Sequence, residues 1–417
     1  QIDYLDWTGQ LKGVSQTSAR GRNPMTSLPT RASPQTSAQA QLAKASELAG
    51  EFAITAAEYD RSAAFPFANF EALRRAGLLS LTVPESAGGL GQGLATACGV
   101  VGRIAAGEPS TALVLAMHYI YSAVPALTGT WNADATNQLW RESVDGMALI
   151  NVMRAEPELG TPARGGLPAT TATPSPSGWR LSGHKLYATG SPILRYLIVW
   201  ARTAGDDPSV GWFMVPNGAA GVSYVETWDH LGMRATGSHD LILDSVEIPE
   251  HYALDVRPPA SWMPPDPVQP IWNNLVLGAL YNGVACAARD WLSRYLHERK
   301  PSNLGASLAT LPRFQAAMGE IEALLFTNAR LLDGLSAEAD DSGYSQRLAG
   351  ETSLAKYVVT ANAIRAVDIA IALVGNPGLS RSNPLERHHR DVLCGRIHVP
   401  QDDMILLGAG RAALNIT

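Results

Sequence analysis

The middle of the chain carries the stretch Ser182-Gly-His-Lys-Leu-Tyr-Ala-Thr-Gly190, a short run bounded by turn residues. Around it, apolar and aromatic residues tend toward a period of two and are separated by Gly, Pro, Asn or Asp, which is typical of short antiparallel strands. This pattern predicts a β domain over residues 149–262. The predicted strands include Trp179–Leu181, Tyr187–Thr189, Tyr196–Ala201, Trp212–Val215 and Leu241–Ile248.

On both sides of the β region, apolar residues recur every three or four positions, as one face of a helix requires. Residues 41–148 form the predicted N-terminal helical domain, in which Ser110 is expected to cap a helix after Pro109. A proline-rich connector, Pro249–Pro270, leads to long helices predicted in residues 263–417, whose short breaks are typical of a four-helix bundle. We therefore expect an α+β protein in the order helical domain, β domain, helical bundle.

Residues 1–40 are rich in small and polar residues and show no apolar period. We predict a leader or disordered segment here, with Met25 as a candidate natural start and residues 1–24 upstream of it. The opening has no cationic head followed by an apolar core, so no export signal is expected.

Composition excludes several classes of partner. The 417 residues include 32 Lys plus Arg against 38 Asp plus Glu, a net charge of -6 with no basic block, so neither nucleic acid nor a membrane is an expected partner. The longest apolar stretch, 113–127, contains His118 and is shorter than the ~20 residues that cross a bilayer. Widely spaced Cys98, Cys286 and Cys394 rule out a disulfide framework and favour a reducing, cytoplasmic setting.

Five short strings, in the same order along the chain, resemble those of the acyl-CoA dehydrogenase superfamily of flavoproteins. Five strings in register are far more specific than any one of them. The strings are Val83-Pro-Glu-Ser-Ala-Gly-Gly-Leu-Gly91; Ser182–Gly190; Leu231-Gly-Met-Arg-Ala-Thr-Gly-Ser238 with Val246-Glu-Ile-Pro249; Arg299 with Leu304-Gly305 and Phe314-Gln315; and Gly375-Asn-Pro-Gly378 with Leu385-Glu-Arg-His-His-Arg-Asp391.

The resemblance implies an N-terminal α-helical domain, a central antiparallel β-barrel and a C-terminal four-helix bundle, assembled as a homotetramer. It also implies a flavin, FMN or FAD, held between barrel and bundle and touched by a neighbouring subunit. A strand hydroxyl suits the flavin ring, a guanidinium suits phosphate, and glycines allow close approach to a pyrophosphate. The alternatives are a plain strand threonine for Thr189, a cation at a helix end for Arg299, and a helix-ending turn for Gly375–Gly378. The implied flavin contacts are Tyr187, Thr189, Arg299, Gly375, Asn376 and Gly378.

Acyl-CoA dehydrogenases carry a glutamate that removes the α-proton of the substrate, at either of two positions. Here the position in the final segment holds Val399, and the alternative on the first bundle helix holds Asn273. Neither side chain accepts a proton at neutral pH. Glu386 is not at the expected position and is expected to pair with Arg390, four residues further on. The sequence therefore argues against ordinary acyl-CoA dehydrogenation.

The ending Arg390-Asp-Val-Leu-Cys-Gly-Arg-Ile-His398 instead resembles the monooxygenase branch of the superfamily, which includes dibenzothiophene monooxygenase and amino-sugar N-oxygenases. The resemblance implies catalytic roles for His398, His118 and Asn151. His398 is the candidate to protonate or hold a peroxide, because imidazole changes charge near neutral pH. The alternatives are a histidine at the bundle edge for His398, a core histidine bonded to backbone for His118, and an asparagine that ties a turn for Asn151.

Three hypotheses follow. The favoured one is a flavin-dependent monooxygenase of a two-component system, which takes reduced flavin from a separate reductase and oxygenates a small apolar or aromatic molecule through a flavin C4a-hydroperoxide. The second is an FAD-dependent acyl-CoA dehydrogenase whose base comes from elsewhere, and the third is a flavin-free scaffold. No metal is expected, because the adjacent His388 and His389 would face different sides of a helix.

Overall fold

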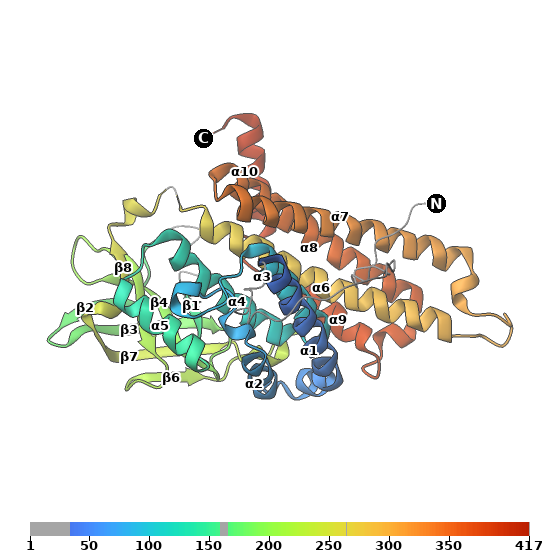
Figure 1. The fold of residues 1–417 in the computed structure, drawn as a ribbon, viewed down its shortest axis with the longest axis horizontal. Helices are drawn as coiled ribbons and strands as arrows, with labels where there is room; N and C mark the ends of the chain where they lie inside the picture. Colours follow the sequence, from blue (N-terminus) through green and yellow to red (C-terminus); the bar gives the residue numbers. More distant parts are fainter. Residues whose placement is uncertain (1–33, 159–165, 264, 417) are drawn as a thin grey trace, which may run out of the picture.

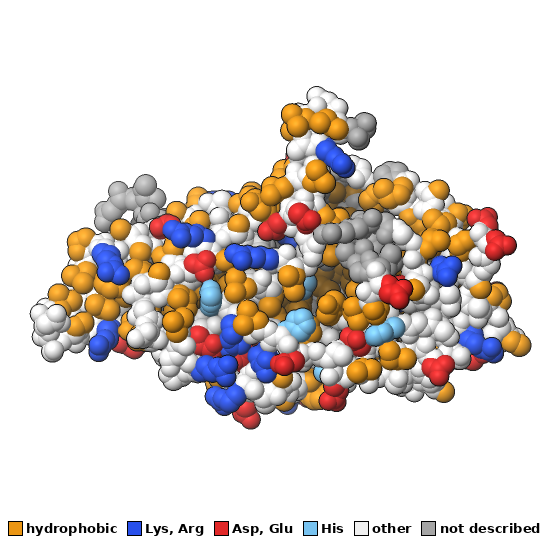
Figure 2. Space-filling view, turned by 180° about the vertical axis from the view of Figure 1, so that it is seen from behind, with side chains coloured by type: hydrophobic (Ala, Val, Ile, Leu, Met, Phe, Trp, Pro, Cys, Tyr) orange, Lys and Arg blue, Asp and Glu red, His pale blue; other side chains and the backbone are white. Residues whose placement is uncertain are grey.

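The computed structural model describes residues 34–158, 166–263 and 265–416. Figure 1 shows a β-sheet at one end, long helices at the other, and the N-terminal helices packed against both. On the reverse face, apolar side chains gather around a hollow near the middle of the molecule (Figure 2). The predicted leader, residues 1–24, lies outside the described residues. Helix α1 (Pro34–Ser62) begins before the predicted start at Gln41, with proline in its first turn, where a missing N–H is no loss.

The N-terminal part contains α1, α2 (Phe67–Arg75), α3 (Leu94–Gly107), α4 (Pro109–Thr128) and α5 (Ala133–Asp145). Helix α4 is almost wholly buried and packs against strand β1 and helix α6. The prediction that Ser110 caps helix α4 is wrong, because the N-cap is Glu108. The Glu108 carboxylate accepts hydrogen bonds from the N–H groups of Ser110 and Thr111, at 3.0 and 2.6 Å. A carboxylate at this end satisfies two free N–H groups and suits the helix dipole.

The strands form one sheet with the order β6-β7-β3-β2-β4-β5-β8, and β1 pairs with β4. The prediction of an antiparallel barrel needs correction, because β1 and β2 both run parallel to β4 and no pairing among the described strands closes the sheet. The predicted connector is also partly strand, since β8 lies within it. The strands are β1 (Leu149–Met153), β2 (Thr171–Ser175), β3 (Gly178–Ala188), β4 (Leu194–Thr203), β5 (Val210–Pro216), β6 (Val222–Val225), β7 (His239–Pro249) and β8 (Ala253–Arg257).

The C-terminal part contains three long helices, α6 (Val268–Glu298), α7 (Pro312–Ser342) and α8 (Gln346–Val374), followed by the shorter α9 (Pro384–Leu393) and α10 (Asp402–Leu414). Helix α6 is the most enclosed, since α3, α4, α7, α8 and α9 all pack against it. Helical C-terminal structure is thus confirmed. The short connections reverse the chain twice, so the C-terminal ends of α6 and α8 lie at the same end of the helices.

Helices α4 and α8 are long and apolar enough to cross a membrane by length and composition alone, but 78% and 50% of these windows are buried inside the protein. Such burial is expected of helices in a protein core. Cys98, Cys286 and Cys394 are all free in the structure.

Candidate active site

The segment after α9, residues 394–400, is called the His398 loop here and is held by side chains of α6 and α8. Asn273 on α6 donates through Nδ2 to the carbonyl oxygen of Val399 over 2.6 Å. Lys356 on α8 is buried, and its Nζ donates to the carbonyl oxygens on either side of Val399 over 2.8 and 2.7 Å. Three consecutive carbonyl groups are thereby fixed, so His398 is presented in a defined orientation.

The imidazole of His398 is neutral. Burial and the nearby Lys356 ammonium lower the pKa of His398 to about 3. The hydroxyl of Tyr281 lies 2.7 Å from Nδ1, and burial raises the pKa of Tyr281 well above its ordinary value. Tyr281 therefore donates to Nδ1, and we assign the ring proton to Nε2. His398 thus offers an N–H donor rather than a cationic acid.

The two positions at which the resemblance implies a glutamate lie side by side. Asn273 and Val399, joined by the 2.6 Å hydrogen bond, provide no carboxylate. The carboxylate of Asp402, at the start of α10, acts electrostatically on Lys356. Its Oδ1 is buried and has no hydrogen-bond partner among the described residues. Asp402 is therefore the local candidate if the chemistry requires a proton acceptor.

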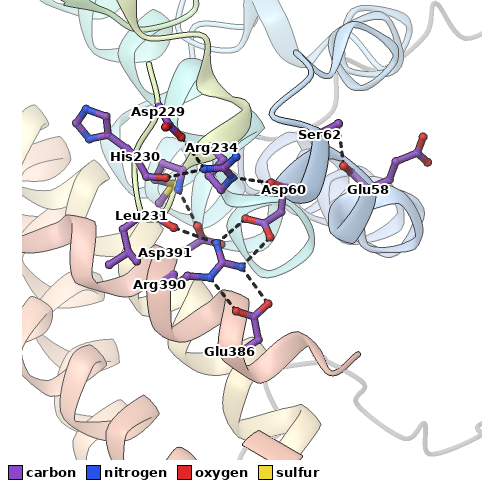
Figure 3. Close-up of polar contacts among 11 residues, drawn as sticks. Glu58, Asp60, Ser62, Asp229, His230, Leu231, Arg234, Glu386, Arg390 and Asp391 are labelled. Carbon is purple, nitrogen blue, oxygen red and sulfur yellow. Dashed lines mark hydrogen bonds and ion pairs between the residues drawn. The ribbon is translucent and has the colours of Figure 1, made fainter. Parts of the chain in front are cut away.

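Arg390, at the end of α9, joins three parts of the chain (Figure 3). Its guanidinium bonds Glu386 at 2.8 and 3.0 Å, which confirms the predicted pair, and Asp60 on α1 at 2.8 and 2.7 Å. Beside it, Asp391 accepts a hydrogen bond from the backbone N–H of Met233 over 2.7 Å. Helix α1, the loop before β7 and α9 are fixed to one another here, immediately upstream of the His398 loop.

A chain of hydrogen bonds leads from this junction to strand β1. Thr236 Oγ1 donates to the carbonyl oxygen of Met233 over 3.0 Å and lies 2.7 Å from Ser238 Oγ, which lies 2.9 Å from Thr189 Oγ1. Asn151 Nδ2 donates to the carbonyl oxygen of Thr189 over 3.0 Å. The structure thus brings together Asn151 and Thr189, both singled out by sequence. Ser238 and Thr236 were missed because hydroxyl residues next to glycine are ordinary in turns.

His118 is engaged by the protein's own backbone. Its Nε2 donates to the carbonyl oxygen of Leu79 over 2.8 Å, and the N–H of Ile150 donates to Nδ1 over 3.4 Å. Burial lowers the pKa of His118 to about 4. These contacts favour the alternative of a core histidine, which holds the strand that carries Asn151.

An exposed aromatic cluster lies beside Thr189. Tyr187, 53% exposed, contacts the rings of Trp228 and His230 edge to face, with centroids 6.5 and 6.1 Å apart. Trp228 and His230 stack at 3.7 Å. The φ of Tyr187 is 59°, a left-handed conformation that is strained for tyrosine and common at functional sites. The cluster presents aromatic surface next to Thr189. His230 was missed, although it directly precedes the string that begins at Leu231.

The other implied flavin contacts lie elsewhere. Arg299 follows the last residue of α6, and Gly375, Asn376 and Gly378 follow the end of α8. Figure 1 shows that this end of the long helices points away from the sheet. One chain therefore does not bring these residues together with Thr189.

The neighbouring histidines of α9 face different surroundings. His388 is buried, whereas His389 Nε2 lies 3.1 Å from the carboxylate of Asp368. Within residues 34–158, 166–263 and 265–416, no group of three or more His, Cys, Asp or Glu side chains is placed to hold a metal ion.

The chain matches the family models for the acyl-CoA dehydrogenase N-terminal domain over residues 36–131, middle domain over 151–246 and C-terminal domain over 275–402. It is 34% identical to the putative acyl-CoA dehydrogenase YdbM of Bacillus subtilis (strain 168) over 369 residues, which cover 87% of this chain and 93% of that protein. This protein therefore belongs to the acyl-CoA dehydrogenase family.

Monooxygenases also resemble this chain. A probable FMNH2-dependent monooxygenase, SfnC of Pseudomonas putida, is 27% identical over 379 residues, which cover 87% of this chain and 91% of SfnC. The crystal structure of dibenzothiophene monooxygenase TdsC from Paenibacillus sp. A11-2 superposes with a TM-score of 0.79 at 23% identity, and covers 90% of this chain and 97% of TdsC. The likeness to TdsC, at 23% identity, concerns the fold alone.

Proposed function

We propose that this protein is a flavin-dependent monooxygenase of a two-component system, which oxygenates a small apolar or aromatic molecule. One observation carries the proposal. The resemblance implies a glutamate at one of two positions, and in this chain those positions hold Asn273 and Val399, which lie side by side and are joined by a hydrogen bond. An amide that donates to a backbone carbonyl cannot remove an α-proton. The similarity to the probable FMNH2-dependent monooxygenase SfnC supports the same class.

Each group has a role that follows from its contacts. Tyr187 and Trp228 supply surfaces for the flavin ring, and Thr189, held by Asn151, supplies a hydroxyl at its edge. When bound and reduced, the flavin supplies the electrons that activate dioxygen. The Nε2–H of His398 holds a polar oxygen in place, since Tyr281 occupies its other nitrogen.

The proposal includes assembly as a homotetramer and a separate flavin reductase. In such an assembly Arg299 and the turn Gly375–Gly378 complete the flavin site of a neighbouring subunit, which explains why they lie away from Thr189 in one chain. Helix α10 supports association, because it projects from the body and exposes apolar side chains (Figure 2). These are Leu406, Leu407 and Leu414 in the helix and Ile416 just beyond it. A cytoplasmic location stays a prediction.

The alternative, an FAD-dependent acyl-CoA dehydrogenase acting on a CoA thioester, is favoured by two observations. The putative acyl-CoA dehydrogenase YdbM is 34% identical to this chain. Asp402, with a buried oxygen that no described residue bonds, lies close enough to the His398 loop to act on Lys356. If this alternative is correct, Asp402→Asn abolishes flavin reduction by acyl-CoA.

The experiment mixes protein loaded with reduced FMN with dissolved oxygen and follows flavin absorbance in a stopped-flow instrument. We expect a transient species that matches neither oxidised nor reduced flavin, and we expect His398→Ala to shorten its lifetime by about tenfold or more. His389→Ala is the matched control, because His389 lies on α9 and bonds Asp368 instead. No transient in the wild type refutes the proposed function. An unchanged lifetime in His398→Ala refutes the role of His398.

A further inference from the structure

Three hydroxyl groups lie in a row beside the exposed aromatic cluster. Thr236 Oγ1 lies 2.7 Å from Ser238 Oγ, and Ser238 Oγ lies 2.9 Å from Thr189 Oγ1. Thr236 and Ser238 are buried, whereas Thr189 is half-buried. We call these three residues the hydroxyl relay. Its inner end is enclosed by the protein, and its outer end, Thr189, is the partly exposed one.

A backbone carbonyl group fixes the direction of the hydroxyl relay. Thr236 Oγ1 donates to the carbonyl oxygen of Met233 over 3.0 Å. A carbonyl oxygen has no hydrogen and can only accept, so any other orientation of this hydroxyl would set lone pairs against lone pairs. The Met233 peptide is held from both sides. Its N–H donates to Asp391 over 2.7 Å, and its carbonyl oxygen also accepts from Trp228 Nε1 and from the Thr236 N–H, over 3.0 and 3.2 Å.

Each hydroxyl has a single hydrogen to donate, so the direction set by Met233 passes along the hydroxyl relay. Thr236 uses its hydrogen on Met233 and therefore accepts from Ser238. Ser238 then has no hydrogen left for Thr189, so Thr189 Oγ1 donates to Ser238. Among the described residues, Ser238 is the hydrogen-bond partner of the Thr189 hydroxyl. Thr189 therefore presents oxygen lone pairs, and no O–H, to a ligand.

The backbone of Thr189 is fixed as well. Asn151 Nδ2 donates to its carbonyl oxygen over 3.0 Å, and its own N–H donates to the carbonyl oxygen of Tyr187 over 2.8 Å. The ring of Tyr187 is exposed and contacts Trp228. An aromatic surface and a hydroxyl that can only accept therefore lie next to each other, which are the two features that a flat ring with an N–H at its edge would use.

We propose that the hydroxyl relay makes this site select reduced over oxidised flavin, with Ser238 and Thr236 as positioning residues. Reduction turns a bare nitrogen of the central flavin ring, which accepts hydrogen bonds, into an N–H donor. A hydroxyl that can only accept bonds this N–H, but it meets the bare nitrogen of the oxidised ring with lone pairs against lone pairs. The inference rests on the proposed function, because it takes flavin as the ligand beside Thr189.

The test compares the affinities of the purified protein for oxidised and photoreduced FMN by anaerobic titration calorimetry. We expect the wild type to bind reduced FMN at least about tenfold more tightly than oxidised FMN. Ser238→Ala frees the hydrogen of Thr189, which can then donate to the oxidised ring, so we expect the ratio of the two affinities to fall about fivefold or more. Thr236→Val removes the group that sets the direction and is expected to lower the ratio in the same way. Thr236→Ser keeps the hydroxyl and is expected to keep the ratio.

Ser191→Ala is the matched control. The hydroxyl of Ser191 is also buried, and it donates to the carbonyl oxygen of Gly237 over 2.7 Å, outside the hydroxyl relay. We expect this variant to keep the affinity ratio of the wild type. A ratio that falls equally in Ser191→Ala and Ser238→Ala overturns the proposal.

A purely structural role of the hydroxyl relay would weaken both forms of FMN equally and leave their ratio intact in Ser238→Ala and Thr236→Val, which overturns the proposal. Equal affinity of the wild type for the two forms overturns it as well. A ratio that depends on the relay, without the oxygen transient, refutes the proposed function alone. The transient together with a ratio that the relay variants do not change refutes this inference alone.

Discussion

The two ends of the segment from Arg390 to Pro400 are held by different chemistry. At the upstream end, Arg390 pairs with two carboxylates, Asp60 and Glu386, and fixes α1 to α9. At the downstream end, the His398 loop is held by an amide, a phenol and an ammonium, all of which donate to carbonyl oxygens or to the imidazole. Opposite charges lock the parts of the molecule together, whereas the loop beside the candidate reaction centre is fixed without using a carboxylate. This difference separates a structural junction from the loop that carries the proposed reaction centre.

Substitution of Arg390, at the upstream end, is expected to have the largest effect on the free energy of unfolding. Arg390→Met leaves Asp60 and Glu386, whose side chains are 16% and 13% exposed, without their cation. We expect a loss of about 3 kcal/mol in the free energy of unfolding, measured by urea denaturation. Arg347→Met is the matched control: Arg347 also pairs with two glutamates, Glu338 and Glu351, but is 62% exposed, so its loss costs less than about 1 kcal/mol. Equal losses in the two variants contradict a special role for the junction.

The next largest expected effect is on how the folding stability depends on pH, through Asp391. Burial raises the pKa of Asp391 to about 7, with Asp60 adding to the shift, while the N–H of Met233 and the charge of Arg387 oppose it. The folded state therefore holds a proton that the unfolded chain, with a pKa of about 3.9, releases, and stability falls as pH rises from about 4 to 7.

Asp391→Asn keeps an acceptor for Met233 but cannot ionise. We expect this variant to be more stable than the wild type by roughly 2 kcal/mol at pH 8, and the difference to vanish toward pH 4. Urea midpoints measured from pH 4 to 8 check this. A difference that is constant with pH, or that grows as pH falls, contradicts the buried carboxyl.

The smallest expected effect is at the downstream end. Tyr281→Phe removes the hydroxyl that donates to His398 Nδ1, which costs about 1 kcal/mol of stability. Without this donor the proton is no longer confined to Nε2, so ¹⁵N NMR of the ring should show a mixture of tautomers. A His398 signal identical to that of the wild type shows that Tyr281 does not fix the ring.

Local patterns predicted much of this molecule from its sequence. The order of helical and β parts followed from periodicity and the five strings, and the Glu386–Arg390 pair followed from helical spacing alone. The parallel pairing of β1 with β4 could not be predicted, because strand direction depends on how distant segments fold back. The same reason hid the contact between Tyr281 and His398, which lie 117 positions apart.

The most direct test of the account asks whether a proton acceptor is present at the reaction centre. Protein loaded with oxidised flavin is mixed anaerobically with saturated acyl-CoA thioesters of short, medium and aromatic-substituted chains, and the flavin absorbance is followed. Because Asn273 and Val399 replace the glutamate, the account predicts that the flavin stays oxidised with every thioester. Rapid bleaching by any of them, lost in Asp402→Asn, would contradict the account and identify the protein as a thioester dehydrogenase.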